Sequence, residues 1–453
     1  MKNNILIILF FTSLLMADNA SFEKWQNQEA ESFERFQSTE DRKFMKFLKE
    51  WEWYQEGKSP NYYYKQKLQK QPIKESIVIN KEYNLITKPK PIITPIIKDD
   101  SFINFFGNQI PFTYSKKVVP PIEQPSVGAV GHFWKYITKQ NYQKIVNELQ
   151  IYQSKYRLNG WATYILIQKI TKQMSSHINT QNLLQWFFLL KMGIDTKVGI
   201  NKTKIVLMIY SQDIIYATHY FTINNKRYFI LNSTSSTSSL RIYKQGDRNL
   251  LALNFLGQYP ILKQKVKKRR LNFRFKEKSY TIPFYYNQNL IDFYGSYPQI
   301  QYNYYTQMDI SNQTSQTISK TLKNIISSMN QHNAINFLLR LTQTGFNYQR
   351  DHTQFGKEKV MFFEESLAYP YSDCEDRAIF FTHLVKKLLH LDILFVKYPN
   401  HLATAISINT NIKGDNLIYH NKKYYIADPT YSQSNIGQAM PKMKGIKFKI
   451  IEP

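Results

Sequence analysis

Residues 373–431 combine a helical pattern with two short strands, and this order limits the fold more than any other feature of the chain. After Cys374, apolar residues recur at the spacing of one helix face. The stretches "YPNHLATAISI" from residue 398 and "HNKKYYIADPTY" from residue 420 are bounded by turn residues, as is typical of strands. A helix followed by two neighbouring strands predicts an α+β fold in which the helix packs on an antiparallel sheet.

Three side chains with the chemistry of an activated nucleophile fall at the ends of these elements. Cys374 is the only cysteine in 453 residues, and Asp373 is a good helix N-cap, so the thiol is predicted at the first turn. His401 opens the first strand and Asp428 ends the second. Where such elements adjoin, histidine takes the thiol proton and aspartate orients the imidazole. The three residues are therefore a candidate catalytic triad.

The position of Cys374 has opposing effects on the thiol pKa. Backbone N–H groups and the positive end of a helix dipole favour thiolate and lower that pKa. Asp373, Glu375 and Asp376 oppose this effect, so a base close in space is still needed. We expect Glu375 and Asp376 to form a charge pair or salt bridges at the helix start rather than to act as acids or bases.

The strings "DCEDRA", "YPNHLATAI" and "YYIADPTY" resemble the transglutaminase-like cysteine peptidase superfamily, over residues 317–436. The resemblance implies a papain-like α+β core with Cys374, His401 and Asp428 as its catalytic residues. It also implies an enzyme that attacks protein or peptide amides through a thioester. Such an enzyme either hydrolyses the bond or passes the acyl group to an amine.

The oxyanion site carries over from this resemblance only in part. The backbone N–H of Cys374 is the expected first donor. For the second donor, Gln354, Tyr369 and Tyr371 all remain open, and Tyr369 is our choice.

No cofactor or metal is predicted. The chain has no H-E-x-x-H motif, no pair of cysteines and no glycine-rich phosphate loop.

The charge of the chain is strongly positive, with 60 Lys and Arg against 33 Asp and Glu and a formal net charge of +27. Only KVKKRR at 265–270 forms a dense block, and no nucleic-acid-binding motif surrounds it. We therefore interpret the charge as a diffuse lysine bias and expect no nucleic-acid partner.

The N-terminus has the features of a secretory signal peptide over residues 1–20. Lys2 precedes an apolar stretch from Ile5 to Met16, and small residues follow. No cysteine lies near the cleavage site, and no later run approaches 18 consecutive apolar residues. These features predict a periplasmic or secreted protein without a transmembrane segment in the mature chain.

Residues 21–60 predict a long amphipathic helix. Its aromatic pairs Phe22/Trp25, Phe33/Phe36 and Phe44/Phe47 repeat every eleven residues, which is close to three helical turns. The resulting stripe packs either on the rest of the chain or on another molecule. In the second case, residues 21–56 mediate self-association or bind a partner at the cell envelope.

Between this helix and the cysteine segment, three regions are predicted. Residues 61–128 form a Pro-rich linker with short strands, 129–240 a helical and then stranded module, and 241–316 a β-rich domain that precedes the catalytic domain at 317–453. "NNKRYFILNST" at 224–234 aligns with "HNKKYYIADPT" at 420–430, which makes 129–240 a candidate inactive copy of the transglutaminase-like module. Two unrelated helix–strand–strand units remain an equal alternative. In a true copy, the triad positions hold Ile178, Ile205 and Asn232, none of which can perform the chemistry.

Two classes of function follow from the sequence. The first is an exported thiol enzyme acting on protein or peptide amides. The second is a non-catalytic periplasmic scaffold of the same fold that binds peptides or cell-wall polymer.

Overall fold

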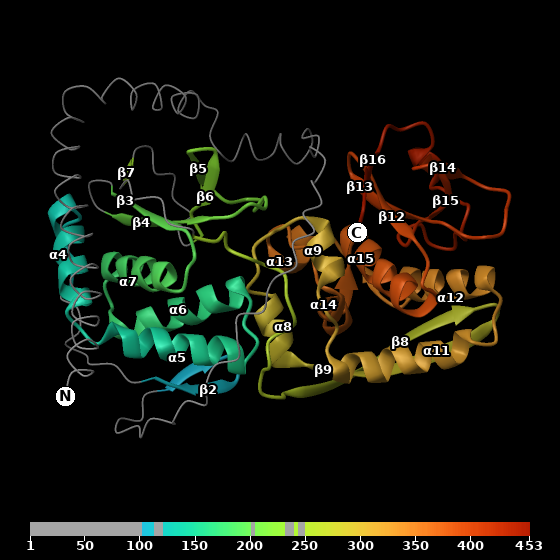
Figure 1. Ribbon diagram of the computed structural model, residues 1–453. Coiled ribbons are helices and arrows are strands. Elements are labelled where there is room, and N and C mark those ends of the chain that lie inside the picture. The colour runs from blue at the N-terminus through green and yellow to red at the C-terminus, as the bar shows by residue number, and fades with distance from the viewer. Residues whose placement is uncertain (1–101, 113–120, 201–203, 232–239, 243–249) are drawn as a thin grey trace, which may run out of the picture.

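The computed structural model describes residues 102–112, 121–200, 204–231, 240–242 and 250–453 (Figure 1). The predicted signal peptide and the aromatic helix at 21–60 lie outside the described residues, as does most of the predicted linker. The described chain is mixed α+β, with helices packed against two curled antiparallel sheets. No helix in this part of the chain is both long and apolar enough to cross a membrane.

The first sheet lies in the N-terminal half and has the strand order β5-β6-β4-β3-β7. Helix α7 packs on its strands β3 and β4, and α6 packs on α7. Helix α7 buries almost every residue from 179 to 190, so it forms the centre of this half. The elements are α4 (Val127–Thr138), α5 (Tyr142–Lys155), α6 (Gly160–Met174), α7 (Ile178–Lys191), β3 (Thr196–Ile200), β4 (Ile205–Tyr210), β5 (Tyr220–Ile223), β6 (Lys226–Phe229) and β7 (Arg241–Ile242), preceded by the hairpin β1 (Phe102–Phe105) and β2 (Asn108–Pro111).

The second sheet lies in the C-terminal half and has the order β14-β15-β13-β12-β16. Helix α15 packs on β13, α12 packs on α15, and the long hairpin β8–β9 packs on α12. The hairpin, the helices and the sheet therefore form three successive layers (Figure 1). The elements here are β8 (Val266–Phe275), β9 (Lys278–Asn287), α12 (Gln331–Thr344), α15 (Cys374–Leu384), β12 (Ile393–Tyr398), β13 (His401–Ile406), β14 (Asn416–Tyr419), β15 (Lys422–Ala427) and β16 (Lys449–Ile451).

Short elements join the two halves and frame the site. They are α8 (Gln288–Tyr294), α9 (Tyr302–Gln307), α10 (Asn312–Thr314), the π-helical turn η2 (Ser315–Ser319), α11 (Lys320–Ile326), β10 (Asn347–Tyr348), α13 (Asp351–Phe355), α14 (Phe363–Ala368), β11 (Tyr371–Ser372), the π-helical turn η3 (Val385–Leu389) and the 3-10 turn η4 (Pro441–Met443). One hydrophobic cluster runs through both halves. It includes Phe187 of α7 together with Ile379 of α15 and Leu402 of β13.

The two sheets also match in strand register and in one of their turns. The pair Ile200↔Ile205 in the first sheet matches Lys397↔Leu402 in the second, and Ile209↔Phe229 matches Ile406↔Tyr425. In each sheet, the strand pair aligned in the sequence ends in a two-residue turn with positive φ at both residues. These residues are Asn224 and Asn225 in one turn and His420 and Asn421 in the other, as a type I′ turn requires.

Three patterns in the sequence differ in detail from the structure. Helical spacing over residues 317–341 predicts a single helix, but this stretch is divided among η2, α11 and α12, because the Asn330 side chain accepts from the Asn333 N–H and starts a new helix. The apolar and aromatic stretch from Ile214 predicts a strand, but the strand begins only at Tyr220. The strands described between 250 and 316 form one hairpin, whose Phe273 packs with Phe337 of α12 in a shared core.

Candidate active site

Cys374 is the first residue of α15, as the sequence predicts. Asp373 is the N-cap, and its carboxylate accepts from the N–H groups of Glu375 and Asp376 at 3.2 and 3.5 Å. The Asp376 carboxylate accepts in return from the Asp373 N–H, which completes a capping box. The N–H groups of Glu375 and Asp376 are therefore occupied by the Asp373 carboxylate.

The packing of α15 on β13 brings the thiol to the start of that strand. The backbone N–H of Leu402, the residue after His401, lies near enough to the Cys374 thiol to act on its pKa. Sγ donates a hydrogen bond to Glu375 Oε2 at 2.8 Å. Among the described residues this is the hydrogen bond of the thiol, and none joins it to His401. Cys374 as a residue is partly exposed.

His401 and Asp428 form a buried pair where β13 begins and β15 ends. His401 Nε2 lies 2.8 Å from Asp428 Oδ2, and the two side chains are 5% and 1% exposed. The other oxygen, Oδ1, accepts from the N–H groups of Thr430 and Tyr431. Both carboxylate oxygens therefore have hydrogen-bond partners. In the tautomer whose Nε2–H donates to Asp428, His401 Nδ1 is the nitrogen left to accept a proton.

Of the opposing effects expected on the Cys374 pKa, those that raise it are larger. Burial, followed by the charges of Glu375 and Asp373 and the hydrogen bond to Glu375, raises the thiol pKa well above its ordinary range. The Leu402 backbone N–H acts in the opposite direction. The helix start contributes little, because the N–H groups of Glu375 and Asp376 donate to the Asp373 carboxylate.

Glu375 is held in place by residues from two other elements. Lys397 on β12 lies 3.2 Å from Glu375 Oε1, and the Tyr302 hydroxyl of α9 lies 3.5 Å from the same oxygen. Lys397 also donates to the Tyr302 hydroxyl and stands over its ring. Burial acts to raise the pKa of Glu375, but Lys397 and the Cys374 thiol lower it below its usual range. Glu375 is therefore ionised and salt-bridged, as expected for this helix start.

The tyrosines beside the thiol differ from the one chosen from the sequence. The ring of Tyr369 packs on Phe355, and after burial its pKa is raised mainly by Glu365. By contrast, Cys374 contributes to the raised pKa of Tyr348 and of Tyr302, again after burial. Tyr348 is 51% exposed, so it also meets solvent. No sequence signal marked it, because its position depends on the fold of residues 345–373.

The other two oxyanion candidates lie on different elements. Tyr371 is in the short strand β11, which pairs with Asn347 in β10. Gln354 is on α13, and both of its amide atoms are buried without a hydrogen-bond partner among the described residues.

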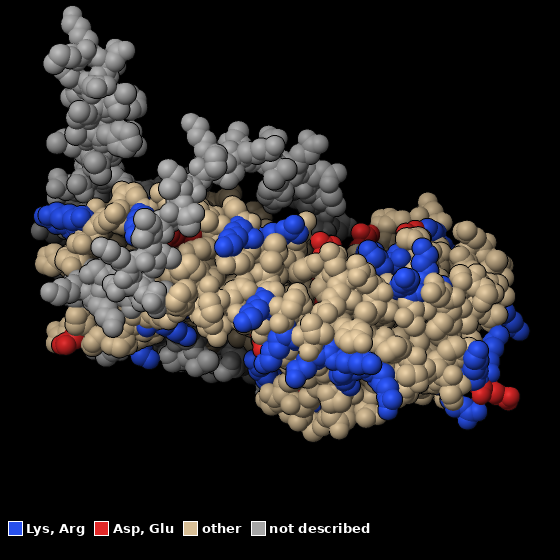
Figure 2. All heavy atoms as spheres, turned by 90° about the horizontal axis from the view of Figure 1, so that it is seen from below, with Lys and Arg blue, Asp and Glu red and all other residues tan. Residues whose placement is uncertain are grey.

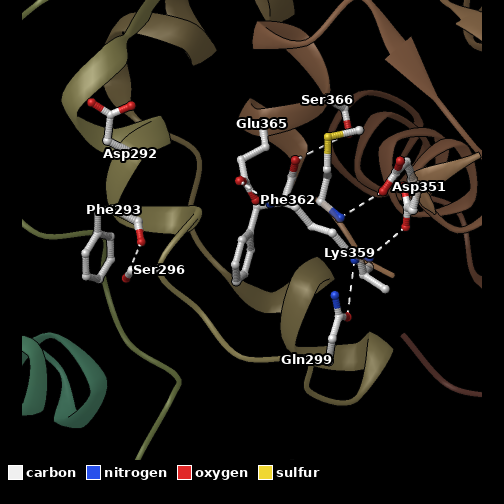
Figure 3. A network of polar contacts seen from close by, with 12 residues as sticks. Asp292, Phe293, Ser296, Gln299, Asp351, Lys359, Phe362, Glu365 and Ser366 are labelled. Carbon is white, nitrogen blue, oxygen red and sulfur yellow. Dashed lines mark hydrogen bonds and ion pairs between the residues drawn. The ribbon is translucent and has the colours of Figure 1, made fainter. Parts of the chain in front are cut away.

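An extended segment, residues 358–362, is fixed behind the helix start by side chains that accept from four of its N–H groups (Figure 3). The N–H groups of Lys359, Val360, Met361 and Phe362 donate to Asp351, Gln299, Asp376 and Glu365. The ammonium of Lys359 also lies 2.6 Å from Glu365 Oε1, in a pair with 13% and 0% exposed side chains. This segment ties α13 and α14 to the cap of the thiol helix.

Buried carboxylates gather at this junction. Asp351, Asp373 and Asp376 each place one oxygen within 4.8 Å of the others, and Asp373, Cys374 and Glu375 do the same. Burial first, and then the neighbouring carboxylates, raise the pKa of Asp373 to about 10 and that of Asp376 well above its usual range. These groups are close enough to hold one cation. Asp373 and Asp376 already cap the helix and Asp351 and Asp376 bind the 358–362 segment, so proximity alone assigns no metal.

His383, on the same helix, has a structural role. It bonds the Tyr305 carbonyl, and burial lowers its pKa to about 4, so it is neutral.

Comparison with protein family models, with curated proteins and with solved structures returned no match.

Proposed function

We propose that the protein is an exported thiol enzyme that cleaves or transfers protein or peptide amide bonds, with Cys374, His401 and Asp428 as its triad. One observation carries the proposal. His401, buried and paired with Asp428, is the first residue of the strand on which the thiol helix packs, and the Leu402 backbone that follows it acts on the pKa of the chain's only thiol. A cysteine with a purely structural role has no need of a buried imidazole–carboxylate pair on the strand that its helix contacts.

The proposed reaction begins when the thiol leaves Glu375 and gives its proton to His401 Nδ1. The sulfur then forms a bond with the amide carbon, and the Nδ1 proton passes to the departing amine as the C–N bond breaks. Water or a second amine attacks the resulting thioester, giving its own proton to Nδ1 as the C–S bond breaks. Asp428 keeps Nε2–H oriented and stabilises the imidazolium throughout.

Two groups are suited to the negative charge that develops on the carbonyl oxygen. The Cys374 backbone N–H has no acceptor among the described residues and lies at the start of α15. The Tyr348 residue is half exposed, and the Cys374 charge acts on the pKa of its phenol after burial. We therefore favour Tyr348 over Tyr369 as the second donor.

We also propose that the first sheet and its helices are an inactive copy of the second unit. The shared strand order, register and type I′ turn support this. Ile178 is the first residue of α7, as Cys374 is the first residue of α15. By strand register, Ile205 has the position in the first sheet that Leu402 has in the second. Lys204, rather than Ile205, therefore occupies the place of His401. Lys204→Ala should leave turnover unchanged, and a loss as deep as that of His401→Ala would contradict this assignment.

The non-catalytic scaffold remains the alternative, because the resting thiol is protonated and bonded to Glu375. One experiment separates the two. The protein is incubated with an extract of envelope proteins, and new peptide termini or cross-links are identified by mass spectrometry. Cys374→Ala and His401→Ala should abolish the products, whereas Asp428→Ala should retain a small fraction of the activity.

The matched control is His420→Ala, which removes an exposed histidine from the turn between β14 and β15. It should behave as the native protein. Products that persist in Cys374→Ala would exclude the triad.

A further inference from the structure

The outer face of the β8–β9 hairpin is basic and open to solvent. Leu271, Phe273 and Phe275 of β8 are buried in the core shared with α12. The alternate residues Lys268, Arg270 and Arg274 project to the opposite, exposed face. Their partners on β9 are Tyr285, Pro283 and Ser279, which are also exposed. The basic block at residues 265–270 therefore belongs to one ordered surface, in addition to the lysine excess spread over the whole chain.

This face carries almost no negative charge. Between residues 263 and 287 the only acidic residue is Glu277, in the hairpin turn. Within the described residues, no Lys or Arg of residues 263–278 forms a salt bridge. From below, where the hairpin lies in Figure 1, Lys and Arg side chains form a band with few acidic atoms near it (Figure 2).

Apolar side chains lie on this face where β8 begins and β9 ends. Val266 is 47% exposed and Tyr285 37% exposed, and they are diagonal neighbours beside Lys268. Lys268 stands over the Tyr285 ring at 5.7 Å. A flat surface that mixes lysine and arginine with an aliphatic side chain and a tyrosine is typical of contact with a lipid headgroup layer.

We propose that the hairpin face formed by Val266, Lys268, Arg270, Arg274 and Tyr285 binds the surface of an anionic lipid bilayer. Ten-residue strands give a flat surface about 33 Å long, which several headgroups can meet at once. A nucleic acid would use the cations but would leave Val266 without a role, and stacking of bases needs more than one exposed ring. The lipid surface accounts for both kinds of side chain.

The layer order gives this contact a defined direction. The hairpin lies on one side of α12 and α15, and the sheet that carries His401 lies on the other. Binding through the hairpin therefore leaves that sheet facing away from the lipid. The inference does not depend on the proposed catalytic function.

The test is co-sedimentation of the full chain with vesicles of phosphatidylcholine alone or mixed with 30% phosphatidylglycerol. The native protein should bind the anionic vesicles and release as salt rises from about 0.1 to 0.5 M, because the Debye length shortens. The triple variant Lys268→Glu, Arg270→Glu, Arg274→Glu should bind about a hundredfold more weakly. Val266→Ser with Tyr285→Ser should lose about tenfold at unchanged charge.

The matched control changes the net charge equally at another surface. Lys413→Glu, Lys442→Glu, Lys447→Glu alters three exposed lysines of the C-terminal unit and should bind within about threefold of native. Equal loss in both triple variants would show that net charge alone drives binding and would overturn the proposal. Unchanged binding in the hairpin triple would also overturn it, since the contact would then lie elsewhere in the chain. Tighter binding to an oligonucleotide, lost in the same triple, would make the face a nucleic-acid surface instead. Circular dichroism of each variant checks that the fold is retained.

Discussion

At the scale of single residues, the Cys374 thiol donates to Glu375 and not to His401. Its Sγ lies 2.8 Å from Glu375 Oε2, and against the effect of burial Lys397 lowers the pKa of that carboxyl. Among the described residues no hydrogen bond joins the sulfur to His401, whose imidazole pairs with Asp428. Under the proposed function, Glu375 and His401 compete for the thiol proton, and the thiol has to leave Glu375 before it can react.

The first prediction follows from this competition. In Glu375→Gln the side chain loses its charge, so the Cys374 pKa should decrease and the thiolate fraction at pH 8 should increase. Alkylation by iodoacetamide should then be about tenfold faster than in the native protein, as one pKa unit implies. The pH dependence of the alkylation rate gives the pKa directly. The control is Glu358→Gln, which neutralises an exposed carboxylate paired with His352. An equal alkylation rate in both variants would show that Glu375 does not raise the thiol pKa.

At the scale of elements, the site depends on how α13, the 358–362 segment and the start of α15 are held together. One Asp351 oxygen accepts from the Lys359 N–H, and the other is buried without a hydrogen-bond partner among the residues that the structure describes. Burial, with the charges of Glu358 and Glu375, raises the pKa of Asp351 to about 6. This junction therefore contains a carboxylate that is costly to ionise.

The second prediction is a pH-dependent gain in stability for Asp351→Asn. An unfolded aspartate titrates near pH 3.9, about two pH units below the folded value, so the folded state holds the extra proton between these values. This proton adds to the free energy of unfolding at low pH. The native protein loses that contribution as pH rises from about 4 through 6, and it stays lost at higher pH. Asn keeps the acceptor for Lys359 N–H and cannot ionise. The variant should be more stable by about 1 to 3 kcal/mol at pH 8 and nearly equal at pH 4.

Urea unfolding followed by tryptophan fluorescence at both pH values measures this difference. A gain of the same size at pH 4 would show that packing rather than charge is responsible.

The sequence predicted the parts of the site that rest on local pattern. Asp373 as N-cap and the strands that begin at His401 and end before Asp428 follow from residue type and spacing. The thiol pKa could not be predicted, because it depends on Glu375 being fixed by Lys397 and Tyr302 from distant segments. The break before α12 was missed because a continuous apolar pattern hid the Asn330 cap.

At the scale of the whole molecule, the two halves are not independent bodies. A single cluster contains Phe187 of the first unit and Ile379 of the thiol helix, and the β8–β9 hairpin covers α12 with Phe273 and Phe275. The predicted domain boundary at residue 317 therefore passes through a shared core.

The third prediction is that residues 317–453 do not fold alone. Without the hairpin, Phe337 loses the aromatic contacts of Phe273, Phe275 and Tyr280, and a large apolar surface on α12 is exposed. The fragment should lack a cooperative thermal transition and should aggregate, whereas residues 102–453, which keep the β1–β2 hairpin in the core, should melt cooperatively. Near-ultraviolet circular dichroism and light scattering measure both. A cooperative transition in the short fragment would contradict the shared core.

The matching registers of the two sheets also create a hazard during folding. Strand β4 pairs with β6 at positions that match those at which β13 pairs with β15. During folding, β4 could therefore pair with β15, or β13 with β6. Side-chain size opposes that exchange. Where β13 has Ala403, Thr404 and Ala405, all buried, β4 has Val206, Leu207 and Met208. A misplaced β4 would overfill the second unit, which costs about 1 to 3 kcal/mol for each oversized side chain.

The fourth prediction is that these small side chains protect the chain from strand exchange. A chain with Ala403→Val and Ala405→Met should refold from urea with more strand-exchanged dimer than the native protein, measured by native mass spectrometry. An unchanged yield of monomer would mean that the order of folding, rather than side-chain volume, keeps the two similar halves apart.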